Sequence, residues 1–396
     1  MRKPIAFFLS LVFSLPLYAQ MYPGFKAQEA KDFIALCNSF TYLDLYDSDT
    51  VIIPSGYEKI FTSGVFGMDN KYQVYTNGNH GVICFRGSTD DQKSWLANFT
   101  SAMIPAAGDI KIKNEPFNYV VSNVEGAAVH SGYMLGLGYL HASVLEQIRS
   151  LNRQGIFDIY LTGHSQGGAL SALLLAYLDG LPKGTISSRN QFKNYSFANP
   201  MVGNKRFAQA YNEKYAETGW SMRVINPADP VPKLPMNYME EKALSKRGIL
   251  SLLEDENGFD TGLLLKSAFV QTFEGFATNR VQSMSVSASE RLAKDLGDIV
   301  FPPYVDDINY FQTGQQITLH PFAYPRMYKE WVAASYDSLA ETAVRDSEGY
   351  FVDESYYERP PMFYQHKPHN YYVAVLKAYF PEEYDALMVK YLPEDL

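Results

Sequence analysis

The fold is decided by the stretch Leu161-Thr-Gly163-His-Ser165-Gln166-Gly167-Gly168. An apolar β run ends here, Ser165 lies between two glycines, and a helical pattern begins at once. A sharp turn from strand to helix holds a nucleophile in a strained conformation and requires glycines where the two backbones approach. The helix N-terminus also points backbone N–H groups at negative charge. The stretch therefore predicts a nucleophilic Ser165, with the Gln166 N–H as one donor of an oxyanion hole.

Short apolar runs alternate with longer helical patterns around this stretch, from residue 72 to 226. Such alternation is typical of a parallel sheet covered by helices. The expected strands are Tyr72–Tyr75, Val82–Phe85, Ile156–Leu161, Tyr195–Ala198 and Met222–Asn226, and the expected helices are Gly132–Asn152, Gly167–Leu178 and Lys205–Ala216. We therefore predict an α/β fold with a mostly parallel central sheet flanked by helices.

The alternation stops in residues 236–306, which are predicted to be mostly helical. One face carries Leu265, Phe269, Phe273 and Phe276. This insertion is either a cap or lid over the site, which also settles on a lipid surface, or an ordinary amphipathic helix packed on the domain. Downstream we expect a hairpin over Asn309–Leu319 turning at Thr313-Gly314, a helix near Tyr328–Ala343, and two last helices from about His369 and Glu382.

The composition is that of a globular chain with an acidic balance. The 396 residues are 46% hydrophobic, so a large core is available, and the formal net charge of −9 gives no basic excess for a phosphate backbone. We therefore expect no nucleic-acid partner.

The N-terminus is typical of an export signal. Arg2 and Lys3 precede an apolar run from Ile5 to Leu17, and Tyr18-Ala19-Gln20 offers a cleavage point. The run is too short to span a bilayer. We expect residues 1–19 to be a signal peptide, residues 20–396 to form one domain without a transmembrane segment, and the protein to be secreted or periplasmic.

Cys37 and Cys84 are the two cysteines of the chain. Cys84 lies inside an apolar run, which favours a buried free thiol, while an oxidising compartment leaves a Cys37–Cys84 bridge as the alternative. Cysteine and histidine do not recur with zinc spacing, and we expect neither a metal nor an organic cofactor.

A serine nucleophile needs a general base, and the base needs an orienting acid. With this elbow, both follow the serine along the chain. Asp229 follows a predicted strand at the sheet edge where such sites are built and is the expected acid, with a plain Asp-Pro turn as the alternative. His369, at the start of a helical pattern, is the expected base, and His320 and His366 are the alternatives.

The second donor of the oxyanion hole is expected in the loop after an early strand. Phe85-Arg-Gly-Ser88 occupies that place. Ser88 offers both a backbone N–H and a hydroxyl beside the N–H of Gln166.

Several short blocks occur in a defined order along the chain. They are Val82–Ser88, Ser94–Asn98, Val129–Tyr133, Gly163–Gly168, Phe197–Asn204, Asp229–Pro232, Tyr310–Gly314 and His369-x-x-Tyr372. Together they resemble the class 3 lipases of the α/β-hydrolase superfamily, a group that includes secreted fungal triacylglycerol lipases and plant phospholipases of the A1 type. The resemblance covers about residues 72–235 and 307–380.

This resemblance implies an α/β-hydrolase fold. It also implies Ser165 as nucleophile, Asp229 as acid, His369 as base, and Ser88 with Gln166 as the oxyanion hole. His130 then supports the structure of the site, and His164 packs beside the nucleophile.

The chain departs from the family pattern at three places. Asn98 replaces the acidic residue common after the Trp motif, and Ala198-Asn199 replaces the usual Gly-Ser. The separation of Asp229 from His369 exceeds the fungal pattern because of the insertion. In the fungal relatives the lid follows the oxyanion loop. The corresponding segment here, Asp90–Met103, would form the lid.

The expected function is that of a secreted serine hydrolase. It would cleave carboxylic esters of lipids, as a triacylglycerol lipase or a phospholipase of the A1 type, through an acyl-enzyme on Ser165. Its partners would be a lipid or small ester substrate and, transiently, a lipid surface. The alternatives are a soluble-ester esterase of the feruloyl type and a non-catalytic lipid-binding protein on the same fold.

Overall fold

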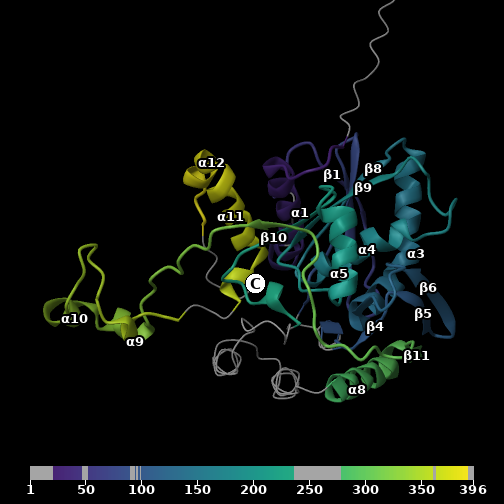
Figure 1. Cartoon of the computed structure of the whole chain (residues 1–396). Helices are drawn as coiled ribbons and strands as arrows, with labels where there is room; N and C mark the ends of the chain where they lie inside the picture. The colour runs from purple at the N-terminus through teal and green to yellow at the C-terminus, as the bar shows by residue number, and fades with distance from the viewer. Residues whose placement is uncertain are drawn as a thin grey trace, which may run out of the picture.

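The computed structural model describes residues 21–46, 52–89, 94, 97–98, 100–235, 278–359 and 363–390 (Figure 1). The predicted signal peptide lies outside these ranges, as do the predicted apolar face at 265–276 and half of the predicted lid at 90–103.

A seven-stranded sheet forms the centre of the molecule (Figure 1). Its strands lie in the order β1-β2-β3-β8-β9-β10-β12. The contacts β1–β2 and β2–β3 are antiparallel, and every later pair is parallel, which confirms the predicted mostly parallel sheet. The strands are β1 (Glu58–Thr62), β2 (Tyr72–Thr76), β3 (His80–Phe85), β8 (Asp158–His164), β9 (Gln191–Phe197), β10 (Ser221–Ile225) and β12 (Gln315–Thr318).

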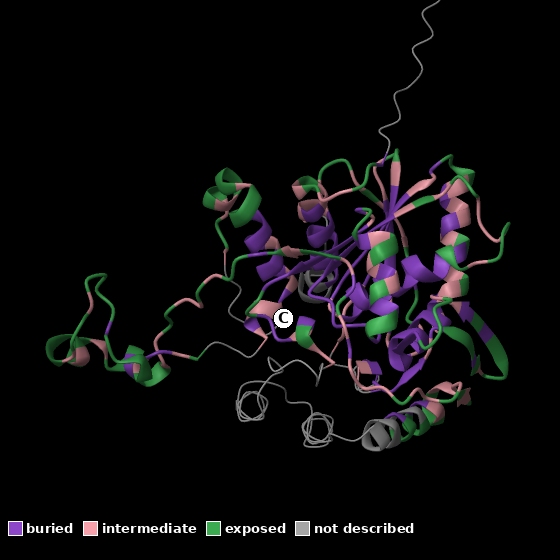
Figure 2. Cartoon of the chain, viewed as in Figure 1, coloured by how far each residue is buried: buried purple, intermediate pink, exposed green. Residues whose placement is uncertain are grey.

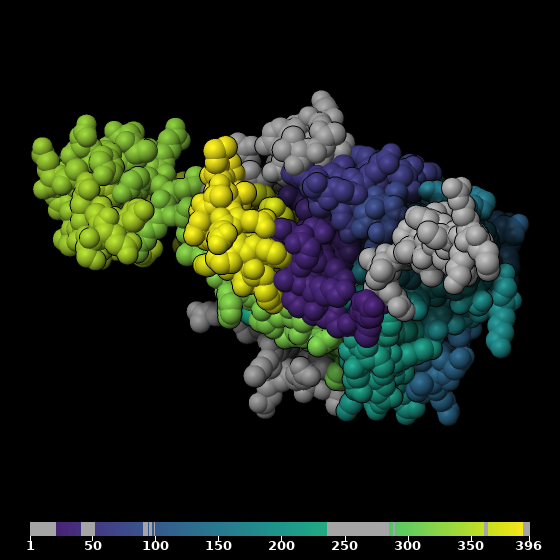
Figure 3. Space-filling model, turned by 90° about the horizontal axis from the view of Figure 1, so that it is seen from above, coloured from purple at the N-terminus to yellow at the C-terminus, as the bar shows by residue number. Residues whose placement is uncertain are grey.

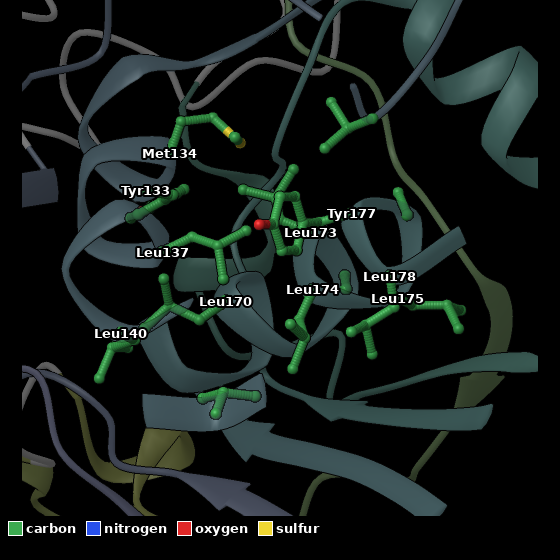
Figure 4. Packing of buried hydrophobic residues seen from close by; sticks show 14 of the residues in the cluster. Tyr133, Met134, Leu137, Leu140, Leu170, Leu173, Leu174, Leu175, Tyr177 and Leu178 are labelled. Carbon is green, nitrogen blue, oxygen red and sulfur yellow. The ribbon is translucent and has the colours of Figure 1, made fainter. Parts of the chain in front are cut away.

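Helices cover both faces of this sheet. One face carries α3 (Ser131–Arg153), α4 (Gln166–Asp179) and α5 (Lys205–Tyr211), the last continued by a π-helical turn over Asn212–Ala216. Leucines of α3 and α4 interlock on this side, as Figure 4 shows. The other face carries α1 (Ala27–Tyr46), to which the sequence analysis assigned no element, and α11 (Pro368–Tyr379).

The two faces explain the apolar runs of the central strands. In β3, Ile83 and Phe85 pack toward α3 and α4, whereas Val82 and Cys84 pack toward α1. A strand buried on both sides is apolar at every position rather than at alternate ones. Figure 2 shows the buried sheet between partly exposed helices.

Two small antiparallel sheets lie beside the main one. One has the order β11-β5-β6, from β11 (Ile299–Val300), β5 (Ala107–Ile112) and β6 (Glu115–Val120). The other pairs β4 (Met103–Pro105) with β7 (Ala128–His130). The sequence analysis did not predict these strands, which are short or largely exposed on one face.

The second half of the insertion contains α8 (Thr278–Leu296), which packs on the body of the protein. The Ser285 hydroxyl accepts a hydrogen bond from the Ala102 N–H at 2.8 Å, and Leu292 is buried in the main core. The role of the insertion as a whole, a cap or lid or a packed amphipathic helix, stays a prediction.

Two downstream predictions are wrong in detail. The expected hairpin over Asn309–Leu319 does not form, because the only strand there, β12, pairs with β10 in parallel and extends the main sheet. The helix expected near Tyr328–Ala343 is divided at Ser335 into α9 (Glu330–Ala334) and α10 (Tyr336–Thr342). The last helices, α11 and α12 (Pro381–Ala386), are confirmed.

Residues 328–357 form a satellite that stands away from the body in both views (Figures 1 and 3). The satellite has a small aromatic core of its own around Val332, Phe351 and Tyr357. It connects β12 to the segment that precedes α11. The last strand and this segment are therefore far apart along the chain.

Cys37 and Cys84 are both buried and unbridged, with 3.8 Å between their sulfur atoms. The Cys37 sulfur also lies 3.8 Å from the Thr162 hydroxyl oxygen. Burial raises the pKa of the Cys84 thiol well above its ordinary value, with Cys37 adding to the effect. The structure therefore has the free thiols that the apolar run favoured.

Candidate active site

Ser165 lies on the elbow between β8 and α4 with φ 57° and ψ −129°. A residue other than glycine rarely adopts a positive φ, so the surrounding structure must hold this conformation. A Cβ atom on Gly163 would lie 2.3 Å from the backbone of Gly167, and a Cβ on Gly167 would lie 2.3 Å from the Phe85 carbonyl oxygen. The two glycines are thus required by close approach, as predicted.

The Ser165 hydroxyl contacts a histidine, and this histidine contacts an aspartate. His366 Nε2 lies 2.9 Å from Ser165 Oγ, and His366 Nδ1 lies 2.8 Å from Asp229 Oδ2. The two ring nitrogens therefore contact different partners, as a general base held by an acid requires. Asp229 is fully buried, whereas the His366 side chain keeps 14% of its surface exposed.

The histidine in this position is His366, and the prediction of His369 is wrong. His366 ends a short 3-10 turn, Tyr364–His366, and α11 begins at Pro368. Because a proline disfavours helical backbone in the preceding residue, His366 remains in the connecting segment, from which its ring reaches the elbow. His369 lies inside the first turn of α11 and is buried, and no described hydrogen bond joins it to Ser165 or Asp229.

The other two histidines downstream of Asp229 therefore have different environments. Burial lowers the pKa of His369 to about 4, against a smaller opposite effect of the Val389 backbone. His320 is exposed, two residues after the end of β12.

Asp229 follows β10, as predicted. Its carboxylate accepts hydrogen bonds from a backbone N–H and a tyrosine hydroxyl, and it also contacts a ring nitrogen of His366. Oδ1 accepts the Val231 N–H at 2.9 Å. Oδ2 accepts the Tyr371 hydroxyl at 2.7 Å in addition to facing His366. Charge-assisted bonds of this kind stabilise a buried carboxylate that would otherwise be costly.

Tyr371 links Asp229 to the backbone after β10. Its hydroxyl oxygen accepts the Asn226 N–H at 3.1 Å while it donates to Asp229. A second link runs from the Asn226 side-chain amide to Gln365 Oε1 at 2.6 Å. The turn that holds the acid and the turn that holds His366 are thus joined directly.

Arg223 is a buried guanidinium behind the acid. It donates to the Pro232 carbonyl at 2.7 Å and to the side-chain carbonyls of Gln312 and Gln316 at 2.8 and 3.2 Å. Burial lowers its pKa to about 10, while Tyr371 and Asp229 act in the opposite direction. Among the described residues, no carboxylate lies within ion-pair distance of it.

His164 and His130 have the packing roles that were expected. The His164 ring lies 4.6 Å from the His366 ring, between centroids, and edge-on to Tyr371. Burial, and then the neighbouring His366, lower its pKa well below the ordinary value, so His164 is neutral. His130 stacks on Tyr133 at 3.8 Å, and burial lowers its pKa to about 3.

Ser88 and Gln166 lie together at the elbow. Gln166 is the first residue of α4, so its N–H belongs to the group that has no partner inside a helix. The Ser88 hydroxyl lies 3.5 Å from Gln166 Oε1, and a Cβ on the preceding Gly87 would lie 3.4 Å from Ser165 Cβ. The loop after β3 therefore runs beside the nucleophile, where an oxyanion hole requires it.

Tyr371 and Arg223 were missed by sequence reasoning as parts of the site. The sequence block placed Tyr372 three residues after His369, whereas the tyrosine that donates to Asp229 is Tyr371. The turn signal Lys367-Pro368 directly after His366 was the feature that could have placed the histidine in a loop.

The described residues contain no group of three His, Cys, Asp or Glu side chains able to hold a metal ion. Within the same ranges, no helix has the length and apolarity to cross a membrane.

A nucleophile elbow, a histidine between serine and aspartate, and a mostly parallel sheet together define the arrangement of a serine hydrolase with the α/β-hydrolase fold. Residues 82–239 match the family described as "Lipase (class 3)". This segment, which contains Ser88, Ser165, Gln166 and Asp229, is therefore similar to the class 3 lipases that the motifs resemble.

Curated proteins with similar sequences are lipases. The secreted mono- and diacylglycerol lipase 1 of Fusarium solani is 30% identical over 141 residues, which is 34% of this chain and 39% of the Fusarium protein. Lipase ZK262.3 of Caenorhabditis elegans is 36% identical over 88 residues, covering 22% of this chain and 23% of that one. The chain thus spans about two fifths or less of these relatives.

Solved structures of fungal lipases also match. The triacylglyceride lipase of Rhizomucor miehei is 23% identical with a TM-score of 0.40, covering 52% of this chain and 74% of that one. Lipase II of Rhizopus niveus is 20% identical with a TM-score of 0.39, covering 53% and 74%.

Proposed function

We propose that this protein hydrolyses carboxylic esters of lipids through Ser165, His366 and Asp229. The observation that carries the proposal is the position of the His366 ring, with Nε2 at 2.9 Å from Ser165 Oγ and Nδ1 at 2.8 Å from Asp229 Oδ2. A lipid-binding protein without catalysis has no need of all three side chains in this geometry.

In the first half of the reaction, Ser165 Oγ attacks the ester carbonyl carbon while His366 Nε2 takes the hydroxyl proton. The buried Asp229 stabilises the positive imidazolium and fixes its orientation. The negative oxygen of the tetrahedral intermediate is stabilised by Ser88 and the Gln166 N–H. The intermediate collapses, the C–O bond to the alcohol breaks, and His366 gives its proton to the departing oxygen.

In the second half, water attacks the acyl-enzyme by the same route. His366 takes a proton from the water as its oxygen bonds to the acyl carbon. The bond to Ser165 Oγ then breaks, the serine recovers its proton, and the carboxylic acid leaves. Neither half requires a redox partner, because every step moves only protons and an acyl group.

The substrate class rests on the family. The match to the class 3 lipases and to the Fusarium and Caenorhabditis lipases supports lipid esters, and the Fusarium relative is a mono- and diacylglycerol lipase. Acylglycerols are therefore the first substrate group to test, and phospholipids of an A1-type reaction are the second. A ratio of activity on long and short acyl chains distinguishes either from a soluble-ester esterase.

The test is labelling by a fluorophosphonate probe, with turnover of p-nitrophenyl butyrate and palmitate measured in parallel. We expect wild type to label and to hydrolyse ester, and Ser165→Ala and His366→Ala to lose turnover by at least about 10³-fold. His369→Ala is the matched control, since a buried histidine outside the relay should leave labelling intact. A wild-type protein that does not label in the presence of lipid would overturn the proposal.

We also propose that residues 1–19 direct export and are removed. In support, Met21, two residues after Ala19, is buried, and its backbone N–H donates to Asp158 Oδ2 at 2.9 Å. N-terminal sequencing of the exported protein should give Gln20 as the first residue. Retention of Met1 in the exported protein would contradict the proposal.

A further inference from the structure

The segment that carries His366 returns to the body after a long excursion of the chain. Phe322, which follows β12, and Gln365, which directly precedes His366, are 43 residues apart along the chain, and the satellite lies between them. Closing a loop of this length costs conformational entropy. The returning segment therefore needs contacts with the body that keep it in one position.

The two ends of the satellite are joined to each other. The Glu358 N–H donates to the Met327 carbonyl oxygen at 2.8 Å, and the Lys329 N–H donates to the Tyr356 carbonyl oxygen at 3.0 Å. These bonds and the aromatic core hold the satellite together, and none of them involves His366. The position of the histidine therefore depends on contacts made closer to the body.

The side-chain amide of Gln365 forms hydrogen bonds at both of its ends. Nε2 donates to the Phe322 carbonyl oxygen at 2.9 Å, and Oε1 accepts the Asn226 side-chain Nδ2 at 2.6 Å. Phe322 lies on the part of the chain that leaves the body, and Asn226 lies at the start of the turn that carries Asp229. One side chain thus joins the outgoing segment, the returning segment and the turn of the catalytic acid.

Backbone groups determine the orientation of both amides. Asn226 is 2% exposed, and its Oδ1 accepts the Ala228 N–H at 3.0 Å, so its Nδ2 points to Gln365. At the other end, the Phe322 carbonyl can accept but cannot donate, so it requires Nε2 of Gln365. A rotated Gln365 amide would place two oxygens together and two N–H₂ groups or oxygens without a partner, and the observed arrangement is therefore the one that satisfies every group.

Tyr364 packs beside this amide but restrains the segment in a different way. Its side chain is 2% exposed, and its ring lies edge-on to Phe322 and Tyr324, at 5.8 and 4.9 Å between centroids. Apolar contacts of this kind are not directional, whereas hydrogen bonds fix distance and angle. The two bonds of Gln365 are thus the contacts that determine where the next residue, His366, is placed.

We propose that Gln365 is a positioning residue that sets the distance from His366 to Ser165. Because its amide is bonded to the turn of Asp229, the base and the acid keep one position relative to each other and to the elbow. A displacement of about 1 Å from a productive geometry costs on the order of 10²-fold in rate, while contacts to substrate remain. The proposal rests on the proposed ester hydrolysis, in which His366 is the general base.

The first test is Gln365→Met, which keeps the length of the side chain and removes both hydrogen bonds. With p-nitrophenyl butyrate as substrate, we expect kcat to fall about tenfold and KM to change by less than about twofold, because the change affects the base and not the binding of substrate. The rate of labelling by the fluorophosphonate probe should fall by the same factor, since that reaction also needs His366 to take the Ser165 proton. A residue with a merely structural role would not separate kcat from KM in this way.

A double-mutant cycle with Asn226→Ser identifies the bond that matters. The serine hydroxyl can still accept the Ala228 N–H, but it is too short to reach Gln365. Asn226→Ser should lower kcat about fivefold in the wild-type background, and by less than about twofold in the Gln365→Met background, where its partner is already gone.

Gln154→Met, the same substitution at an exposed position after α3, is the matched control and should have the kcat and the labelling rate of wild type. If Gln365→Met does not fold, as judged by circular dichroism, Gln365→Glu takes its place in the same cycle. Glutamate keeps an oxygen toward Asn226 and loses the donor to the Phe322 carbonyl, so it should also lower kcat with little change in KM.

Wild-type kcat and labelling in a folded Gln365 variant would overturn the inference, as would equal losses from Asn226→Ser in the two backgrounds. Failure of the proposed function has a different signature, because wild type itself would then show neither probe labelling nor turnover.

Discussion

The Tyr371 hydroxyl donates to Asp229 Oδ2 at 2.7 Å, and this is the same carboxylate oxygen that His366 faces. Burial and the neighbouring carboxylate raise the pKa of Tyr371 well above its ordinary value, so the tyrosine stays a donor at any pH of interest. The acid is thus oriented from the helix that immediately follows His366.

Replacing Tyr371 by Phe should therefore weaken the relay without removing any of its three members. We expect kcat to fall about tenfold and the free energy of unfolding to fall by about 2 kcal/mol, because a buried carboxylate loses a charge-assisted hydrogen bond. Steady-state turnover of a p-nitrophenyl ester and urea denaturation provide the two readings. Tyr379→Phe, a half-exposed tyrosine at the end of the same helix, is the control. An unchanged kcat in Tyr371→Phe would show that the hydroxyl does not orient Asp229.

The buried His369 should make the fold sensitive to acid. Its pKa is about 4 in the folded state because burial disfavours the charged form, whereas an unfolded histidine titrates near 6.5. The unfolded chain therefore binds this proton first, and stability present above pH 6.5 is lost as the pH falls toward 4. By linkage, the loss between pH 7 and pH 5 is about 2 kcal/mol for this residue.

The variant His369→Asn lacks this titratable group. Its Tm should therefore fall less between pH 7 and pH 5 than the Tm of wild type. His320→Asn, on the surface, should follow the wild-type curve. Equal pH dependence in wild type and His369→Asn would contradict the assignment of a neutral, buried His369.

The strands and helices that surround Ser165 were predictable because buried segments show characteristic hydrophobic patterns in the sequence. Strand β3 and the centre of β8 are short apolar or aromatic runs, and α3 and α4 follow with helical spacing. Strands β9 and β10 are also buried but include polar residues such as Lys193 and Arg223. β5, β6 and β11 were missed because they are short or mostly exposed and carry no such run. The N-terminal helix α1 was missed for a different reason, because it does not lie between two predicted strands.

The nucleophile and the acid could be placed from local sequence, but the histidine could not. Ser165 and Asp229 directly follow predicted strands, so the sheet positions them. His366 follows an excursion of the chain through the satellite, and nothing periodic fixes its register. The helical pattern beginning at His369 favoured the wrong residue. His369 lies inside a helix and does not reach the elbow, whereas His366 precedes the helix and does.

The two cysteines should be inert in the folded protein. Both are buried, and the raised pKa of the Cys84 thiol leaves little thiolate to react. Titration with a chromogenic disulfide reagent should find no reactive thiol in the native state and two per chain in guanidinium without reductant. A count of zero after unfolding would show instead that the sulfur atoms, 3.8 Å apart here, have closed to a bond of about 2.05 Å.

The elbow should tolerate no side chain at Gly163. A Cβ there would lie 2.3 Å from the carbonyl group of Gly167, and both partners are backbone, so neither can rotate away. We expect Gly163→Ala to lose more than about 4 kcal/mol of unfolding free energy or to fail to fold, since relief requires moving α4 away from β8. Gly64→Ala, at an exposed position with no atom within 4 Å of the added Cβ, is the matched control and should change stability by less than about 0.5 kcal/mol. Thermal unfolding of the two variants makes the comparison, and a Gly163→Ala protein as stable as Gly64→Ala would mean that strand and helix do not approach as closely as the elbow requires.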